Sequence, residues 1–306
     1  LQSLAASLPL PQALHLVYDW HCLYGFAPEA LQSVPHPLPG PQPGLLLRAE
    51  FHPQRRLRHL GAGRKHPPPG FQSAHNGCFL HPYNVTWQQF GRQFPFALPL
   101  ASRDYNFLLQ PFPFAPLHFT VATAEFFPQD WRLNPAGLRH LLRAMLFASL
   151  ALDDGFAILY NGKDAGNSID WMHFHALRCG QLPVQIAFRL ASPWPLPYRR
   201  AAGTEEEMVE AILDAATQWQ HSAGPAATEC IAIVRDHGRP ACYYFPRHRA
   251  RECAAPHRFA GRVGAYECCG VFIFEQDSEG LALRNGEIGF ANVWQILADV
   301  SPIPKE

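Results

Sequence analysis

Residues 135–177 constrain the fold most, because they join a helix, a strand, a polar loop and a second strand. Asn134 followed by Pro135 is typical of a helix start. An apolar stripe then predicts a helix over residues 135–152; it consists of Leu138, Leu141, Leu142, Met145 and Leu146. Strands are predicted at residues 156–160 and 171–177, on either side of the loop at 161–170. Helix and strand thus follow each other closely along one chain.

The remaining sequence repeats this mixture of strands and helices. Thr204 and Glu207 form a capping-box pattern that predicts a helix through Trp219. The other expected elements are strands at 44–51, 105–109 and 118–122, a hairpin at 230–235 and 242–245, a strand region at 263–274 and a helix at 290–300. The expected fold class is α+β, with a largely antiparallel sheet and flanking helices.

The order of the elements suggests three segments. Residues 1–75 are expected to form a helical and irregular segment that packs on the core, since residues 35–75 are rich in Pro, Gly, Arg and His. Residues 76–200 and 201–306 would be two halves with a similar order of elements, as after an internal duplication.

Charge and composition narrow the function classes. The 306 residues include 25 basic and 25 acidic residues, so the net charge of zero argues against binding to nucleic acids or anionic membranes. No apolar run approaches the ~20 residues of a spanning helix. The first residues lack a signal-peptide pattern, and the eight cysteines do not form a disulfide framework. These features favour a cytoplasmic protein with buried thiols and a small-molecule site.

The chemistry is expected in the segment from Asn161 to Leu177. Side chains alternate along a strand, so His173 and His175 share one face, ~7 Å apart. The preceding loop offers main-chain N–H groups, a hydroxyl and an ammonium group to a phosphate; its candidate residues are Asn161, Lys163, Gly166, Asn167 and Ser168. A nucleophilic imidazole beside such a loop suits phosphoryl or nucleotidyl transfer through a phospho-histidine. The alternatives are a metal-binding pair or a histidine pair in the core.

This segment resembles the histidine-triad superfamily, whose signature is a polar glycine loop, a serine and alternating histidines on a strand. His173 and His175 match the second and third triad positions. The resemblance implies that His173 is the nucleophile and that His175 contacts the phosphate and the leaving group. A register in which His175 attacks and Leu177 takes the third position remains an alternative.

Length and flanking residues are similar to the branch of galactose-1-phosphate uridylyltransferase and the GDP-hexose and diadenosine tetraphosphate phosphorylases. The similarity spans residues 75–300 and includes the segment from Tyr105 to Thr120 and Leu-Pro-Val-Gln at 182–185. It implies that Asn106 and Pro113 help to bind the nucleotide.

Two positions depart from that pattern. Trp171 replaces the first histidine, which orients the nucleophile or ligates structural zinc in relatives. His175 stands where the transferases usually carry glutamine and hydrolytic members carry histidine, so the acceptor stays open. For zinc, the chain offers Cys78 and His81 without a histidine at 171, whereas a tetrahedral site needs four ligands. We therefore expect no required cofactor and no metal.

The sequence thus favours a nucleotidyltransferase or phosphorylase acting on a nucleoside diphosphate-linked substrate, either an NDP-hexose or a dinucleoside polyphosphate. The alternatives are a nucleotide-conjugate hydrolase and a nucleotide-binding protein in which Trp171 has impaired catalysis. Relatives often pair, so a homodimer is one expected state. His118 could face the pocket or be structural. Arg247, His248, Arg249 and Arg251 are expected in a solvated loop, with a phosphate contact as the alternative.

Overall fold

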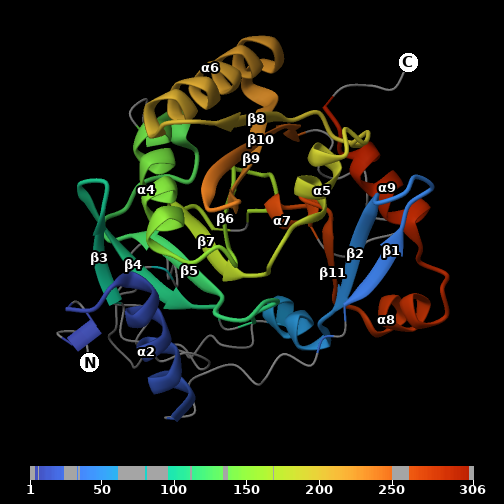
Figure 1. The fold of residues 1–306 in the computed structure, drawn as a ribbon, viewed down its shortest axis with the longest axis horizontal. Coiled ribbons are helices and arrows are strands. Elements are labelled where there is room, and N and C mark those ends of the chain that lie inside the picture. Colours follow the sequence, from blue (N-terminus) through green and yellow to red (C-terminus); the bar gives the residue numbers. More distant parts are fainter. Residues whose placement is uncertain are drawn as a thin grey trace.

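The computed structural model of the chain describes residues 4–5, 7–23, 33, 35–60, 80, 96–110, 112–133, 137–167, 169–249 and 262–302. Within these residues, an eight-stranded sheet has the strand order β3-β4-β5-β7-β6-β9-β10-β8 (Figure 1). Its strands are β3 (Phe96–Leu100), β4 (Arg103–Leu109), β5 (Phe119–Thr123), β6 (Phe156–Asn161), β7 (His173–Arg178), β8 (Arg199–Ala202), β9 (Ala227–Asp236) and β10 (Arg239–His248). All neighbouring strands are antiparallel, which places β7 in the interior of the sheet.

A smaller three-stranded sheet joins early and late parts of the chain. It contains β1 (His36–Pro39), β2 (Leu46–Phe51) and β11 (Val271–Phe274). β2 pairs with β1 in antiparallel and with β11 in parallel orientation. Figure 1 shows this sheet on the right, with α8 (Asp277–Arg284) and α9 (Phe290–Asp299) beside it.

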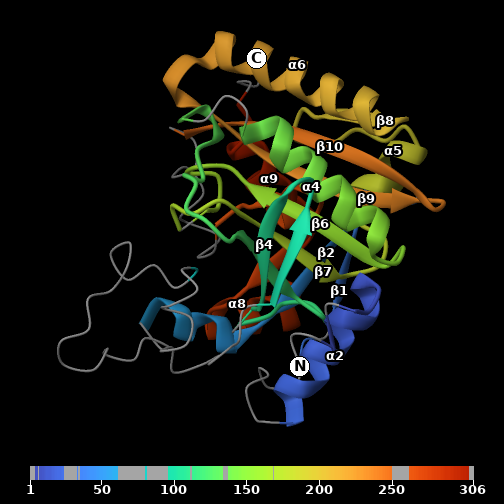
Figure 2. The ribbon, with the colours of Figure 1, turned by 90° about the vertical axis from the view of Figure 1, so that its left-hand side faces the viewer.

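One face of the large sheet is covered by helices α4 (Gly137–Ala151) and α6 (Glu205–Ala223), and α2 (Leu10–Leu23) packs into the same core (Figure 2). Alternate strand residues such as Phe174, Ile158 and Ile231 point into this core together with Leu141 and Ile212 of the helices. Alternate side chains of the strands and the apolar stripes of the helices thus form one continuous core.

The opposite face carries α5 (Pro183–Arg189), α7 (Ala265–Cys268) and the small sheet, which share a second apolar cluster. A third, small cluster includes Leu108, Ala122 and Trp171. Four buried polar residues lie outside the second and third clusters: Asn106, His118, Thr120 and His173. This face therefore carries polar side chains within its interior, where an uncompensated polar group is costly.

The expected fold class, α+β with a largely antiparallel sheet and flanking helices, is confirmed. The predicted helices at 135–152 and from 204 correspond to α4 and α6. The Thr204 hydroxyl accepts the Glu207 N–H at 3.3 Å, and the Glu207 carboxylate accepts the Thr204 N–H at 2.8 Å. The predicted hairpin is formed by β9 and β10. Asn134 and Pro135 lie outside the described residues.

The strand expected over 263–274 is wrong in its first half, where α7 precedes β11. The Gly264 N–H donates to the Glu267 carboxylate at 2.9 Å, and the Ala265 N–H donates to Asn161 Oδ1 at 2.7 Å. These bonds cap a short helix in spite of its apolar sequence. Cys268 and Cys269 consequently lie at the end of α7 and are buried thiols, not residues of a strand.

The expectation of a solvated loop at residues 247–249 is also wrong for Arg247. This side chain lies at the end of β10 and is fully buried. Its Nη1 donates to the Val263 carbonyl oxygen at 3.1 Å and lies 2.9 Å from the Cys268 sulfur. Arg251 lies outside the described residues.

The three expected segments share their sheets. The boundary at residue 200 falls inside β8, which pairs with β10, and the small sheet combines β2 with β11. The division into 1–75, 76–200 and 201–306 stays a prediction, as does the internal duplication. Among the described residues, no helix is both long and apolar enough to cross a lipid bilayer.

Candidate active site

The two histidines of β7 face the same side of the large sheet. The ring centroids of His173 and His175 lie 5.5 Å apart, and the rings are nearly perpendicular. His173 is 5% exposed, whereas His175 is half-buried. The period of the strand thus brings both predicted catalytic residues together in one polar region.

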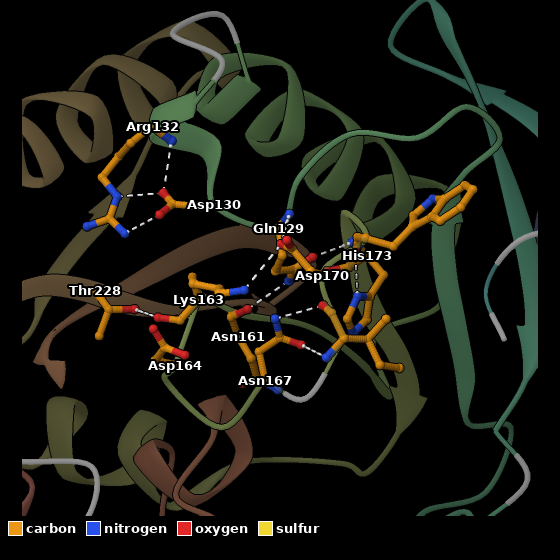
Figure 3. Close-up of polar contacts among 12 residues, drawn as sticks. Gln129, Asp130, Arg132, Asn161, Lys163, Asp164, Asn167, Asp170, His173 and Thr228 are labelled. Atoms are coloured by element: carbon orange, nitrogen blue, oxygen red, sulfur yellow. Dashed lines mark hydrogen bonds and ion pairs between the residues drawn. The ribbon is translucent and has the colours of Figure 1, made fainter. Parts of the chain in front are cut away.

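A main-chain hydrogen bond defines the chemical form of His173. Its Nδ1 lies 2.6 Å from the carbonyl oxygen of Trp171 (Figure 3). A carbonyl oxygen only accepts, so Nδ1 carries the hydrogen and Nε2 of the neutral ring keeps its lone pair. Burial lowers the pKa of His173 to about 4, although this hydrogen bond opposes the shift. At neutral pH the ring is therefore neutral, with Nε2 as its nucleophilic atom.

Trp171 leaves this arrangement intact. The group that orients His173 is the main-chain carbonyl of residue 171, which every residue type provides. The indole itself is buried, and its Nε1–H donates to the Thr123 carbonyl oxygen at 2.9 Å. Trp171 therefore offers no imidazole at this position, while its carbonyl oxygen still orients His173.

His118 supports the second imidazole. Its Nε2 lies 3.1 Å from Nδ1 of His175, and its own Nδ1 is buried without a hydrogen-bond partner in the described structure. A buried N–H without a partner is rarer than a buried lone pair, so we assign the shared hydrogen to His118 Nε2. His175 then carries its hydrogen on Nε2. Burial lowers the pKa of both rings well below the usual value, and the charge of Arg55 lowers both further.

Arg55 comes from the 3-10 helix η1 (Pro53–Leu60) and was not predicted as a site residue. Its Nε lies 3.2 Å from the Glu275 carboxylate, and its guanidinium lies 4.7 Å from the centre of the Phe114 ring. Nη1 donates to the Phe112 carbonyl oxygen. The charge of Arg55 is paired with the Glu275 carboxylate, and it still lowers the pKa of His118 and His175. The surrounding Pro- and Arg-rich sequence has no pattern that singles out this arginine.

The expected phosphate loop packs closely against β9 and α7. The Gly162 N–H donates to the Glu229 carbonyl oxygen at 2.8 Å, and the Thr228 hydroxyl donates to the Lys163 carbonyl oxygen at 2.6 Å (Figure 3). Gly166 has a φ of 81°, and a Cβ atom there would lie 2.8 Å from Cα of Gly264. Glycine is required by both its left-handed conformation and this close approach.

The polar side chains of the loop make contacts within the protein. Asn161 Oδ1 accepts the Ala265 N–H, and the Asn167 amide bonds to both the N–H and the carbonyl oxygen of Ile169. Lys163 Nζ lies 3.5 Å from Asp170 Oδ1. Ser168 lies outside the described residues. The structure thus places the loop beside the histidines, with both asparagines used to hold its shape.

Gln129 connects this loop to His173 and was also missed. Its fully buried amide accepts the His173 N–H at 2.8 Å and donates to the Asn161 carbonyl oxygen at 2.7 Å (Figure 3). It lies between β5 and the 3-10 helix η3 (Trp131–Leu133), in a segment without periodicity. No local sequence signal marks it.

The expected nucleotide-binding residues lie further along the same face. Asn106 is opposite Ala122, which in turn is opposite His173, so these three residues form one row across the sheet. Asn106 is 3% exposed, and its Nδ2 has no hydrogen-bond partner in the described structure. Pro113 is buried between Phe112 and Phe114, which contact Arg55. A buried amide nitrogen without a partner is uncommon in folded proteins.

A protonatable carboxyl group lies beneath the loop. Glu229 is buried on β9, and burial raises its pKa to about 7. Its Oε1 accepts the Trp131 Nε1–H at 2.8 Å. A Cβ atom on Gly162 would lie 2.7 Å from the same oxygen, so the carboxyl group packs directly against the loop.

Of the positions weighed for zinc, the structure describes only Trp171. Cys78 and His81 lie outside the described residues, and Trp171 buries its indole as described. Among the described residues, no group of three or more His, Cys, Asp or Glu side chains could hold a metal ion.

Comparison with known proteins first defines the class of fold. Residues 47–178 match a family described as a domain of unknown function, DUF4922. No curated protein matches the sequence. Among solved structures, the chain shares its fold with a protein of the branch named in the sequence analysis, which confirms the expected fold.

The similar structures are of yeast Ap4A phosphorylase Apa2. Its complex with AMP has a TM-score of 0.64 at 14% identity, and the match covers 95% of each chain. The structure without a named ligand has a TM-score of 0.61 at 14% identity, over 97% of this chain and 98% of the other. The complex with Ap4A has a TM-score of 0.60 at 14% identity, over 95% and 96%. The similarity extends over nearly the whole length of both proteins.

Proposed function

We propose that the chain is a nucleotidyltransferase of the phosphorylase type that acts on a dinucleoside polyphosphate, with His173 as the nucleophile. The observation that carries the proposal is the hydrogen bond from His173 Nδ1 to the Trp171 carbonyl oxygen. It leaves Nε2 with a lone pair, and the lowered pKa keeps the ring neutral. The shared fold with yeast Ap4A phosphorylase supports the substrate class.

In the first step, His173 Nε2 forms a bond to the α-phosphorus, and the bond from that phosphorus to the bridging oxygen breaks. The leaving group is the nucleoside polyphosphate remainder. The ring becomes positively charged when Nε2 is substituted, and the Trp171 carbonyl oxygen stabilises that charge through the Nδ1–H. The Nε2–H of His175 would donate to the phosphate or to the departing oxygen.

In the second step, inorganic phosphate attacks the nucleotidyl-histidine and releases a nucleoside diphosphate, which restores neutral His173. Arg55 and the main-chain N–H groups of the loop are candidates to stabilise the phosphate charges. The buried Nδ2 of Asn106 is available to the nucleotide.

Hydrolysis is a second candidate, because His175 occupies the position that carries histidine in hydrolytic relatives. Its half-buried ring could orient a water molecule in place of phosphate. The two reactions differ in their product: phosphate as acceptor gives a nucleoside diphosphate, whereas water gives a nucleoside monophosphate.

The test uses diadenosine tetraphosphate labelled with ³²P at the α-phosphorus. We expect an acid-labile label on the wild-type chain that is released as ADP only when phosphate is present. His173→Ala should take no label, while the control His237→Ala changes an exposed turn residue and should label normally. Turnover in His173→Ala would contradict the proposal, and phosphate-independent release of AMP would favour hydrolysis.

A further inference from the structure

We infer that Gln129 is a positioning residue that fixes the main chain of His173 relative to the phosphate loop. The inference rests on the proposed function for its effect on the reaction. Its geometric basis is independent: one buried amide makes three hydrogen bonds to main-chain atoms of two strands. These are Oε1 with the His173 N–H at 2.8 Å, Nε2 with the Asn161 carbonyl oxygen at 2.7 Å and Nε2 with the His173 carbonyl oxygen at 3.1 Å.

The register of β6 and β7 shows what the amide replaces. These strands pair from Phe156 with Arg178 to Leu159 with His175. Continued by two residues, the same register would set Asn161 opposite His173, but the pairing of β6 with β7 ends at Leu159, whereas the pairing of β6 with β9 continues to Asn161. The Gln129 amide bonds to both residues at this point. Because a side-chain amide has the same donor and acceptor groups as a peptide, it satisfies both strands while keeping them apart.

Gln129 is itself held from several sides. Its main-chain carbonyl oxygen accepts the Tyr160 hydroxyl at 2.6 Å, and its main-chain N–H donates to Asp170 at 3.3 Å. Asp170 also pairs with Lys163 of the loop. The next residue, Asp130, forms ion pairs with Arg132 and Arg249 at 2.5 and 3.0 Å. The amide is therefore a fixed spacer between the two strands.

The chemical consequence concerns the alignment of the nucleophile. The attacking nitrogen must lie about 3–3.5 Å from phosphorus and in line with the leaving oxygen, and small displacements cost large factors in rate. In the proposed reaction the loop holds the phosphate and β7 holds the ring, so their relative position depends on the group that joins them. Loss of the amide should lower the rate of nucleotidyl transfer more than the affinity for the substrate.

Two variants and a matched control test this role. Gln129→Leu removes all three hydrogen bonds at similar volume. Gln129→Glu keeps the acceptor for the His173 N–H but loses the donors to Asn161 and His173 unless the new carboxyl group is protonated. The control, Gln185→Leu, removes another buried amide, which bonds to Leu182 and Arg235 and to neither histidine of β7.

Labelling from α-³²P diadenosine tetraphosphate is followed at saturating substrate. We expect Gln129→Leu to label about 100-fold more slowly with KM changed less than threefold, and Gln185→Leu to label at the wild-type rate. Gln129→Glu should regain rate as the pH falls from 8 to 5, whereas Gln129→Leu should not. If Gln129→Leu does not fold, the recovery of the rate in Gln129→Glu still tests the inference. Wild-type labelling rates in Gln129→Leu, or no recovery in Gln129→Glu, would overturn the inference.

A wild-type chain that takes no label would contradict the proposed function alone. The exchange rate of the main-chain N–H of His173 then tests the inference, because this measurement requires no catalytic reaction. The exchange rate should rise at least tenfold in Gln129→Leu and stay unchanged in Gln185→Leu. An unchanged rate in Gln129→Leu would show that Gln129 does not hold the main chain of His173.

Discussion

His118 and His175 share one hydrogen between Nε2 and Nδ1 across 3.1 Å, and the other ring nitrogen of His118 has no hydrogen-bond partner in the described structure. The pair links β7 to the residue that immediately precedes β5, so the orientation of the second imidazole is fixed by a residue 57 positions earlier in the chain. The tautomer of His175, and hence which of its ring nitrogens carries the hydrogen, depends on this contact.

We therefore predict that His118→Phe lowers kcat by about 10- to 100-fold, because His175 is no longer held with its hydrogen on Nε2. His118→Gln supplies a new N–H donor and should retain most of the activity. The ¹⁵N chemical shifts of His175 report its tautomer directly. Equal losses of activity in both variants, with an unchanged His175 spectrum, would contradict this role.

A second prediction concerns the pH dependence of His173. Burial lowers its pKa to about 4, so the ring stays neutral from well below pH 6 upward. We expect the NMR titration of its ring to have a midpoint near 4, and labelling to stay constant between pH 8 and 5.5. A midpoint near the usual value of about 6.5 would show that the imidazole is not desolvated.

Gly166→Ala should destabilise the fold by about 2–3 kcal/mol, because a Cβ atom would meet the main chain of Gly264 in an already left-handed conformation. Gly180→Ala is the matched control: its φ of 65° is similar, but nothing lies within 4 Å of the new Cβ atom. It should cost about 1 kcal/mol. Urea unfolding measures both values, and equal costs would exclude the close packing of loop and helix.

Glu229 should make stability depend on pH. Its pKa rises from 4.5 to about 7 on folding, so the folded chain retains a proton that the unfolded chain releases. The stabilisation is fully present below pH 4.5 and is lost as the pH rises through 7, a change on the order of 3 kcal/mol. Glu229→Gln cannot ionise and keeps an acceptor for the Trp131 indole.

Thermal unfolding of wild type and Glu229→Gln between pH 5 and 8 measures this effect. The difference in Tm between the two should grow in favour of the variant as the pH rises. Parallel curves over this range would mean that the carboxyl group is ionised, or neutral, throughout.

Local patterns were sufficient for much of the fold. The apolar stripe from Leu138 to Leu146 predicted α4, and the reciprocal bonds of Thr204 and Glu207 confirmed the predicted start of α6. Period-two alternation correctly placed His173 and His175 on one face. These features depend on neighbours within a few residues, which the sequence displays directly.

The errors and omissions arise where distant residues decide the outcome. Asn161 caps α7 across 104 positions, so an apolar segment that resembles a strand becomes a helix. Arg247 is buried against Val263 and Cys268 although its neighbours in sequence are basic. Gln129 acts through main-chain atoms of His173 and Asn161, and such contacts leave no pattern in the sequence.

The supports of the loop come from outside the part of the chain that matches DUF4922. Residues 47–178 contain both β7 histidines, Gln129 and every residue of the loop, but Thr228, Glu229 and Ala265 lie beyond them. A fragment with those bounds would contain the histidines and the loop, but it would lack the residues of β9 and α7 that pack against the loop. A shortened version of the protein should therefore retain β9 and α7, because the loop packs against both.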